Sequence, residues 1–147
     1  MPRWPDKNRH SCYILKYHLI LVTNYRNPVI TGIVKEDLID LIKSIAGIKW
    51  GCNIIAINTE EDHVHVLFSA PPQVRLSDLV NSIKTCTSRE LRKRHAEFLS
   101  RYYWKPLFWS DSYYIGSVGD TTEEIVTLYI ESQSKKQKKN AANPAQV

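Results

Sequence analysis

Two histidines separated by one residue, His63 and His65, are the pair whose type and spacing most directly suggest chemistry. They belong to the run HVHVLFSA, in which apolar residues alternate with others as in a β-strand. Successive strand side chains point to opposite faces, so both imidazoles share one face, with their backbones roughly 7 Å apart. Two neutral nitrogen ligands in this arrangement can bind a single metal ion.

A second interpretation of the histidine pair is structural. Histidines at alternate positions also occur on the solvated face of a half-buried sheet, where they bind nothing. A zinc finger or a hydrolytic zinc helix is not indicated, because the chain has neither a Cys-x-x-Cys pair nor an HExxH motif. The choice between a metal site and a solvated sheet face therefore depends on residues elsewhere in the chain.

Tyr129 and Gln133 are four residues apart in the run IVTLYIESQSKK, and this spacing places both side chains on one face of a helix. A tyrosine can be a nucleophile that stays covalently bound to its substrate, and a glutamine oxygen can bind a hard cation. Together with two histidines they make a candidate phosphoryl-transfer centre. Ile125 and Leu128 lie on the same side of the helix, so a packing role for Tyr129 remains open.

Composition limits the class of protein. The chain has 147 residues, of which 43% are apolar or aromatic, so it can form one domain with a hydrophobic core. Its net charge of +5 favours an acidic partner, either nucleic acid or an anionic membrane surface. No apolar run reaches the roughly 20 residues that span a bilayer, and residues 1–10 do not form a signal peptide. We therefore expect a cytoplasmic protein that is not inserted in a membrane.

The three cysteines do not indicate a disulfide framework or a structural metal site. Cys12, Cys52 and Cys86 are odd in number and widely spaced. We expect each of them to be a small buried hydrophobic residue rather than a nucleophile.

Hydrophobic periodicity predicts an α+β fold of the ferredoxin-like type, β-α-β-β-α-β, with an additional C-terminal helix that carries Tyr129. The predicted elements are strands over 12–23, 52–59, 64–70 and 113–118, and helices over 31–50, over 78–98 and from 120 onward. Gly51 is expected to stop the first helix, Ser77 to cap the second, and Asp120 to open the last in a capping box with Glu123. Residues 1–139 form the single predicted domain, and 140–147 a disordered tail.

A basic and aromatic segment between residues 84 and 105 is the candidate DNA-binding region. Seven basic residues stand against two acidic ones there, and Tyr102, Tyr103 and Trp104 lie among them. Basic groups beside stacking surfaces suit unpaired or hairpin DNA, although a solvated helix face next to core aromatics has the same composition. The residues that we predict to contact DNA are Lys84, Arg89, Arg92 and Lys93.

These motifs together resemble the single-tyrosine transposases of the HUH superfamily, the TnpA enzymes of the smallest bacterial and archaeal insertion sequences (the IS two-hundred group). The resemblance extends from about Asn8 to Lys138. The matching pieces are Asp62-His63-Val64-His65, the segment from Tyr17-His18 to Tyr25-Arg26, the stretch from Lys84 to Lys93, Phe108-Trp109-Ser110 leading to Tyr113-Tyr114, and Tyr129-x-x-x-Gln133. The chain departs from the family at Thr85, where we would expect a glycine.

The resemblance implies a mechanism. Tyr129 would attack a phosphodiester in single-stranded DNA and form a 5′-phosphotyrosine bond, which leaves a free 3′-hydroxyl. His63, His65 and Gln133 would hold a divalent metal, Mg²⁺ or Mn²⁺, that polarises the phosphate. Asp62 would either orient a histidine ligand or be an exposed carboxylate in a turn.

The resemblance also implies partners, namely single-stranded DNA with hairpin ends and a second copy of the chain. In this family the tyrosine helix of one protomer meets the histidine pair of the other, so we expect a homodimer with composite active sites. Two alternatives remain. The chain could be a domesticated tyrosine transposase that processes repeated palindromes, or a non-catalytic nucleic-acid-binding module with an RNA-recognition-like fold, although it lacks the RGFGFV signature of such modules.

Overall fold

Four antiparallel strands form the central sheet of the computed structural model, which describes residues 6–7 and 9–142, with side chains up to residue 133. The strands are β3 (Lys16–Val22), β4 (Asn53–Glu60), β5 (His63–Ser69) and β6 (Tyr114–Ser117), in the spatial order β4-β5-β3-β6. With α1 (Gly32–Ile42) and α2 (Leu76–Arg94) the chain order is β-α-β-β-α-β, and α4 (Glu123–Ala142) follows. The predicted α+β, ferredoxin-like fold with an additional helix carrying Tyr129 is therefore confirmed.

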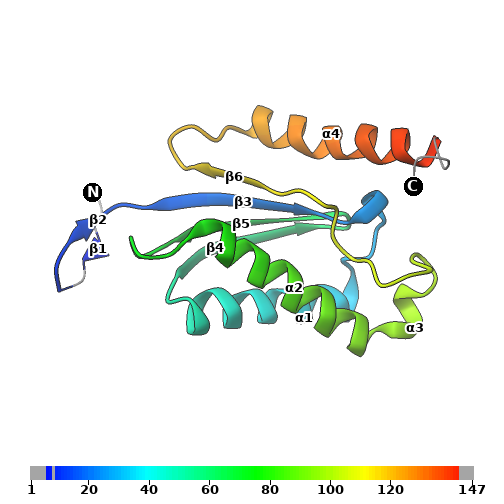
Figure 1. Ribbon diagram of the computed structural model, residues 1–147, viewed down its shortest axis with the longest axis horizontal. Helices are drawn as coiled ribbons and strands as arrows, with labels where there is room; N and C mark the ends of the chain where they lie inside the picture. The colour runs from blue at the N-terminus through cyan, green and yellow to red at the C-terminus, as the bar shows by residue number, and fades with distance from the viewer. Residues whose placement is uncertain (1–5, 8, 143–147) are drawn as a thin grey trace.

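Different helices cover the two faces of this sheet (Figure 1). α1 and α2 pack on one face and bury the main hydrophobic core. The strands contribute alternate residues to that core, among them Leu19, Leu21, Val64, Val66 and Phe68. α4 lies on the opposite face, where Ile130 packs with Ile20 and Val22. The alternation along β3 thus divides its side chains between two apolar clusters.

The pairing of β3 with β5 fixes which residues share the face under α4. Ile20 is paired with His65, and Val22 with His63. Because directly paired residues of antiparallel strands point to the same side, both histidines lie on the face of the sheet that α4 partly covers. The prediction that His63 and His65 share one strand face is confirmed.

Several predicted elements are divided or shifted. Residues 12–23 do not form one strand, because β2 (Cys12–Tyr13) pairs with β1 (Asp6–Lys7) in a separate two-stranded sheet. The first helix continues beyond α1 as a π-helical turn, η2 (Lys43–Lys49), and ends before Gly51, whose φ of +70° suits a helix stop. The helix predicted over 78–98 is α2 followed by the short α3 (Ala96–Leu99).

The two predicted helix caps are wrong. α2 begins at Leu76, so Ser77 lies inside the helix and does not cap it. α4 begins at Glu123, where the Thr122 hydroxyl accepts a hydrogen bond from the Ile125 N–H at 3.3 Å. Asp120 instead accepts a hydrogen bond from the Ser117 hydroxyl at 3.1 Å. An Asp or Ser side chain can satisfy either a turn or a helix end, and the local sequence does not distinguish the two.

The cysteines differ in environment. Cys52 is buried, and burial raises the pKa of its thiol to about 11. Cys86 is partly buried and Cys12 is exposed, so the expectation of a buried residue is wrong for Cys12. All three are free thiols.

The C-terminal helix extends slightly beyond the predicted domain boundary. α4 reaches Ala142, and so includes the first three residues of the segment 140–147 that was predicted to be a disordered tail. Residues 143–147 lie outside the described part of the chain. None of the described helices has the length and apolar content to cross a membrane.

A buried hydrogen bond joins α2 to the connector before β6. Trp109 Nε1 donates to Thr87 Oγ1 at 2.9 Å, and the same hydroxyl donates to the Ile83 carbonyl at 2.6 Å. Thr87 is fully buried. The threonine hydroxyl therefore satisfies a buried indole N–H that would otherwise have no acceptor.

Thr87→Val should lower the free energy of unfolding by about 1 to 3 kcal/mol, because it keeps the shape but leaves the indole N–H unsatisfied. The matched control is Thr85→Val, the same change at an exposed position of the same helix, with an expected effect within about 0.5 kcal/mol. Urea unfolding followed by tryptophan fluorescence measures both. Equal stability of the two variants would show that the Trp109 hydrogen bond contributes nothing.

Candidate active site

A chain of hydrogen bonds holds His63 at the start of β5. His63 Nδ1 lies 2.8 Å from Asp62 Oδ1, and Arg26 Nε donates to Asp62 Oδ2 at 2.8 Å. Burial by itself would raise the pKa of Asp62, but the hydrogen bonds from His63 and Arg26 outweigh burial and lower it. The ionised carboxylate accepts the Nδ1 proton, which leaves the Nε2 lone pair of His63 available to a ligand. These contacts match the orienting role among the two roles considered for Asp62.

The loop that presents Arg26 is tied to the same turn. η1 (Asn24–Arg26) includes Tyr25 and Arg26 with φ values of 60° and 52°. This left-handed conformation costs about 1 to 2 kcal/mol per residue that is not glycine. The buried Thr23 hydroxyl compensates by bonding to the Asn27 carbonyl at 2.8 Å and the Asp62 carbonyl at 3.1 Å. The strained loop thus keeps the guanidinium beside the carboxylate that orients His63.

His65 has a histidine neighbour on β3. Its Nε2 lies 2.6 Å from His18 Nδ1, and the ring centroids are 4.8 Å apart. Burial lowers the pKa of both residues, and nearby His18 and His63 lower that of His65 further. Both imidazoles are therefore neutral near pH 7, which is the form that binds metal ions. The sheet face that α4 partly covers therefore carries three histidines, His18, His63 and His65, where the sequence motif predicts two.

Tyr129 and Gln133 are joined through one serine. The Ser112 hydroxyl lies 2.8 Å from Tyr129 Oη and donates to Gln133 Oε1 at 3.2 Å. Gln133 is 5% exposed, and the Tyr129 ring lies 5.8 Å from the Tyr114 ring, centroid to centroid. Burial raises the pKa of Tyr129, and the Ser112 hydrogen bond opposes this only in part. The prediction that Tyr129 and Gln133 share a helix face is confirmed by their common partner.

Tyr129 of α4 packs on β3, the strand next to β5, which carries the histidine pair. Tyr129 packs against the cluster of Ile20 and Val22, whose partners on β5 are His65 and His63. In the described part of the chain no hydrogen bond joins Tyr129 to either histidine. No group of three or more His, Cys, Asp or Glu side chains among the described residues could hold a metal ion. The predicted ligand set, in which Gln133 completes His63 and His65, stays a prediction.

The predicted DNA-binding residues of α2 have different environments. Arg89 and Lys93 are exposed, and Arg92 Nε donates to the Ser88 hydroxyl at 3.2 Å. Lys84 is half-buried: its ammonium donates to the Ser110 carbonyl at 2.8 Å and reaches the Ser112 carbonyl at 3.5 Å. Burial lowers the pKa of Lys84, and Asp111 opposes this. Lys84 therefore holds the segment that carries Ser112.

Three contributors to the site were not assigned by sequence reasoning: His18, Ser112 and Arg26. His18 is separated from His65 by 47 residues, and Ser112 from Tyr129 by 17. One signal was present for His18, since it alternates with Ile20 and Val22 along the predicted first strand. Ser112 lies in an irregular connector, where no periodicity indicates which way a side chain points.

Comparison with known proteins identifies the family to which the chain belongs. The family model described as "Transposase IS200 like" matches residues 11–133. The ISDra2 transposase TnpA of Deinococcus radiodurans is 34% identical over 137 residues, which cover 93% of this chain and 96% of the relative. The transposase for insertion sequence element IS200 of Salmonella typhimurium is 25% identical over 130 residues, 88% of this chain and 83% of the relative. The chain belongs to the IS200-like transposase family.

Solved structures agree with this assignment. A crystal structure described as a transposase from Deinococcus radiodurans has a TM-score of 0.79 and 31% identity, and the match covers 87% of this chain and 97% of that one. A REP-associated tyrosine transposase bound to a REP hairpin has a TM-score of 0.52 and 12% identity, over 85% of this chain and 68% of that one. The second likeness is one of fold alone.

Lys84→Met should lower the free energy of unfolding by about 1.5 to 3 kcal/mol, because the Ser110 carbonyl loses its charged donor. Lys93→Met, the same change at an exposed position of α2, should shift it by less than about 0.5 kcal/mol. Thermal and urea unfolding measure both variants. If the two are equally stable, Lys84 does not hold the connector.

Proposed function

We propose that this transposase cleaves and rejoins single-stranded DNA at insertion-sequence ends, with Tyr129 as the nucleophile. The observation that carries the proposal is the position of Tyr129, on the same sheet face as His63 and His65 and one strand away from them. The phenol O–H gives up its proton as the oxygen bonds to phosphorus, the bond from phosphorus to the 3′ oxygen breaks, and that oxygen takes up a proton from solvent. The new 5′-phosphotyrosine ester conserves the energy of the broken bond, so a 3′-hydroxyl can later reverse the step.

The donor set suits a divalent metal. His63 offers Nε2 because Asp62 holds its Nδ1 proton, His65 is neutral, and Gln133 contributes a neutral amide oxygen. A bound Mg²⁺ or Mn²⁺ would act as a Lewis acid on the scissile phosphate. Imidazole ligands favour Mn²⁺, and an amide oxygen suits either ion.

The chain's own groups prepare the nucleophile. Tyr129 is protonated near pH 7 in the free protein, because burial raises the pKa of its phenol. The Ser112 hydroxyl fixes the direction of the phenol oxygen and the Gln133 amide at the same time. Ordering of both groups before DNA binds reduces the entropy lost when the reacting atoms meet.

We also propose that the DNA carries a hairpin, bound in part by the basic surface of α2 with Arg89, Arg92 and Lys93. A distant relative of the same fold binds a REP hairpin, which supports a folded DNA substrate. The identity of 34% to an insertion-sequence transposase, against 12% to the REP-associated enzyme, favours mobile-element transposition over palindrome processing. Family membership likewise favours an enzyme over a non-catalytic RNA-recognition-like module. Action on DNA is consistent with a cytoplasmic location.

Tyr129→Phe should abolish a covalent protein–DNA adduct, because the attacking oxygen is removed. Labelled single-stranded DNA with a hairpin is incubated with protein and Mn²⁺, or with a chelator, and run on a denaturing gel. Tyr114→Phe is the matched control: it makes the same change on a ring next to Tyr129 and should keep the adduct. An adduct that persists in Tyr129→Phe would refute the assignment of the nucleophile. An adduct that forms in the presence of the chelator would refute the proposed need for a divalent metal.

We propose further that the working enzyme is a homodimer with composite active sites. α4 leaves Ile125 and Leu128 exposed, at 37% and 65%, which is consistent with a helix that also meets another protein surface. A second copy is the partner that the family resemblance implies.

Mixing two inactive variants tests this arrangement. His63→Ala/His65→Ala protein retains the tyrosine, and Tyr129→Phe protein retains the histidine pair. A heterodimer of the two has one intact composite site if each site draws on both chains, so the mixture should recover part of the adduct seen on the gel. No recovery, with subunit exchange verified by mass spectrometry, would place each site within one chain.

A further inference from the structure

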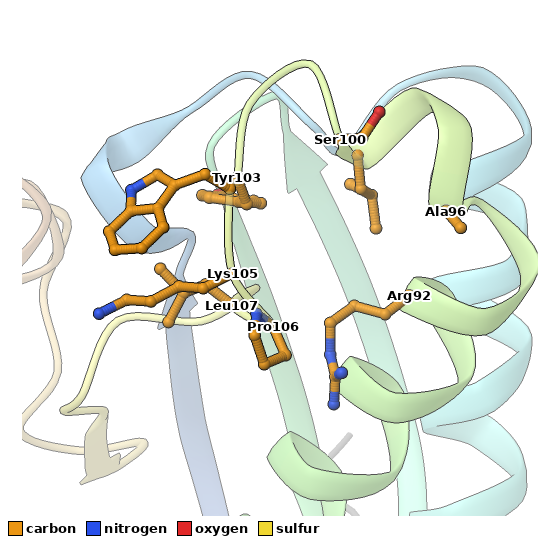
Figure 2. Close-up of a pocket in the computed structure, with 9 residues that line it drawn as sticks. Arg92, Ala96, Ser100, Tyr103, Lys105, Pro106 and Leu107 are labelled. Carbon is orange, nitrogen blue, oxygen red and sulfur yellow. The ribbon is translucent and has the colours of Figure 1, made fainter.

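A pocket of about 330 Å³ lies where α2 ends and the chain returns toward β6 (Figure 2). We call it the connector pocket. It is lined by Arg92, Ala96, Leu99, Ser100, Tyr103, Trp104, Lys105, Pro106 and Leu107. Figure 2 places Arg92 of α2 on one side and Lys105 and Pro106 of the connector on the other. Its volume is at the small end of the roughly 300 to 1,000 Å³ of ligand pockets.

The walls of the connector pocket are fixed by buried contacts. Tyr103 is 6% exposed, and its hydroxyl donates to the Asn24 carbonyl at 2.9 Å. Its backbone N–H donates to the Leu99 carbonyl at 2.9 Å, and Leu99 itself is buried in the hydrophobic core. A ligand would therefore enter a cavity that exists before binding, with little loss of conformational entropy.

Trp104 lines the pocket but is not part of the hydrophobic core. Its side chain is 83% exposed, although an indole gains free energy when it is buried. The Lys105 ammonium lies 4.9 Å from the centre of its ring system. A planar aromatic surface left in solvent beside a cation is the arrangement on which unpaired bases stack.

The charge of the pocket selects for an anion. None of its nine lining residues is acidic, whereas Arg92 and Lys105 approach it from two different segments. Ser88 accepts the Arg92 Nε hydrogen bond, which directs the guanidinium while its terminal nitrogens can still donate. The Lys105 ammonium lies by the Trp104 ring and points away from Arg92, which is on the opposite side of the pocket. An aromatic surface on one side and a guanidinium on the other, in a space of this size, match one nucleotide: a flat base and its phosphate.

We propose that the connector pocket binds a single unpaired nucleotide of the DNA substrate, with its base stacked on Trp104 and its phosphate bound by Arg92. The proposal rests on DNA being the substrate of this transposase. α3, which contributes Ala96 and Leu99 to the lining of the pocket, lies on the side of the sheet opposite α4 (Figure 1). The pocket therefore serves recognition of the substrate and is separate from the tyrosine that cuts it.

The test combines abasic scanning with a tryptophan variant. Fluorescence anisotropy, with a chelator present to prevent cleavage, gives the Kd for a hairpin with unpaired flanks in which each unpaired nucleotide is replaced in turn by an abasic one. An abasic nucleotide at one position should raise the Kd of wild-type protein about 5- to 100-fold, the range for loss of one stacked base. Trp104→Ala should weaken binding of the intact DNA by a similar factor. The two changes together should cause no further loss, because they remove the same contact.

Trp104→Phe and Tyr102→Ala are the control variants. Trp104→Phe keeps an aromatic surface and should retain most of the affinity. Tyr102 is a partly exposed aromatic residue of the same connector that does not line the pocket, so Tyr102→Ala should bind like the wild type. The proposal would be overturned if Tyr102→Ala and Trp104→Ala lost affinity for DNA equally. It would also be overturned if the losses of affinity from Trp104→Ala and from the abasic replacement added up at every position.

The binding test and the adduct test distinguish a failure of the pocket proposal from a failure of the proposed strand-transfer chemistry. If wild-type protein forms the Tyr129 adduct but Trp104→Ala binds all the DNAs as tightly as wild type, the pocket proposal is overturned and strand transfer stands. If no adduct forms but the non-additive loss at one position is found, the pocket is supported and the nucleophile assignment is not. Failure of wild-type protein to bind unpaired DNA would overturn the pocket as well.

Discussion

The register between β3 and β5 is the constraint on which both the core and the site depend. With Ile20 opposite His65 and Val22 opposite His63, the alternate residues Leu19, Leu21, Val64 and Val66 all face α1 and α2. A slip of one residue would turn these apolar side chains to the opposite face and bury the histidines. Burial of four aliphatic side chains contributes about 1.5 to 3 kcal/mol each, so the hydrophobic core fixes the geometry of the histidine pair.

The elements and the paired motifs could be predicted from sequence because they are periodic and local. Period-two alternation identified β5, and helical spacing placed Tyr129 and Gln133 on one face of α4. The contacts of His18 and Ser112 could not be predicted in this way, because they cross from one strand to another or from a connector to a helix. The helix caps failed for a related reason: Asp120 found a partner in Ser117 within its own turn.

The connector between α3 and β6 leads from the helices on one face of the sheet to the sheet itself (Figure 1). Trp109 and Tyr103 anchor it to the core, and Lys84 holds the carbonyls of Ser110 and Ser112. Ser112 then contacts the tyrosine. The same segment therefore shapes the connector pocket at its start and positions Tyr129, the proposed nucleophile, at its end.

α4 is held to the sheet by two kinds of interaction with different strengths. Ile130 packs on Ile20 and Val22, and burial of such a side chain contributes about 1.5 to 3 kcal/mol. The hydrogen bond between Tyr129 and Ser112 contributes a net of about 0.5 to 1.5 kcal/mol, because water can replace it. The phenol can therefore exchange Ser112 for a DNA phosphate at small cost while the apolar contact stays. The packing determines where the helix lies, and the weaker polar contact leaves the phenol of Tyr129, the proposed nucleophile, able to change partners.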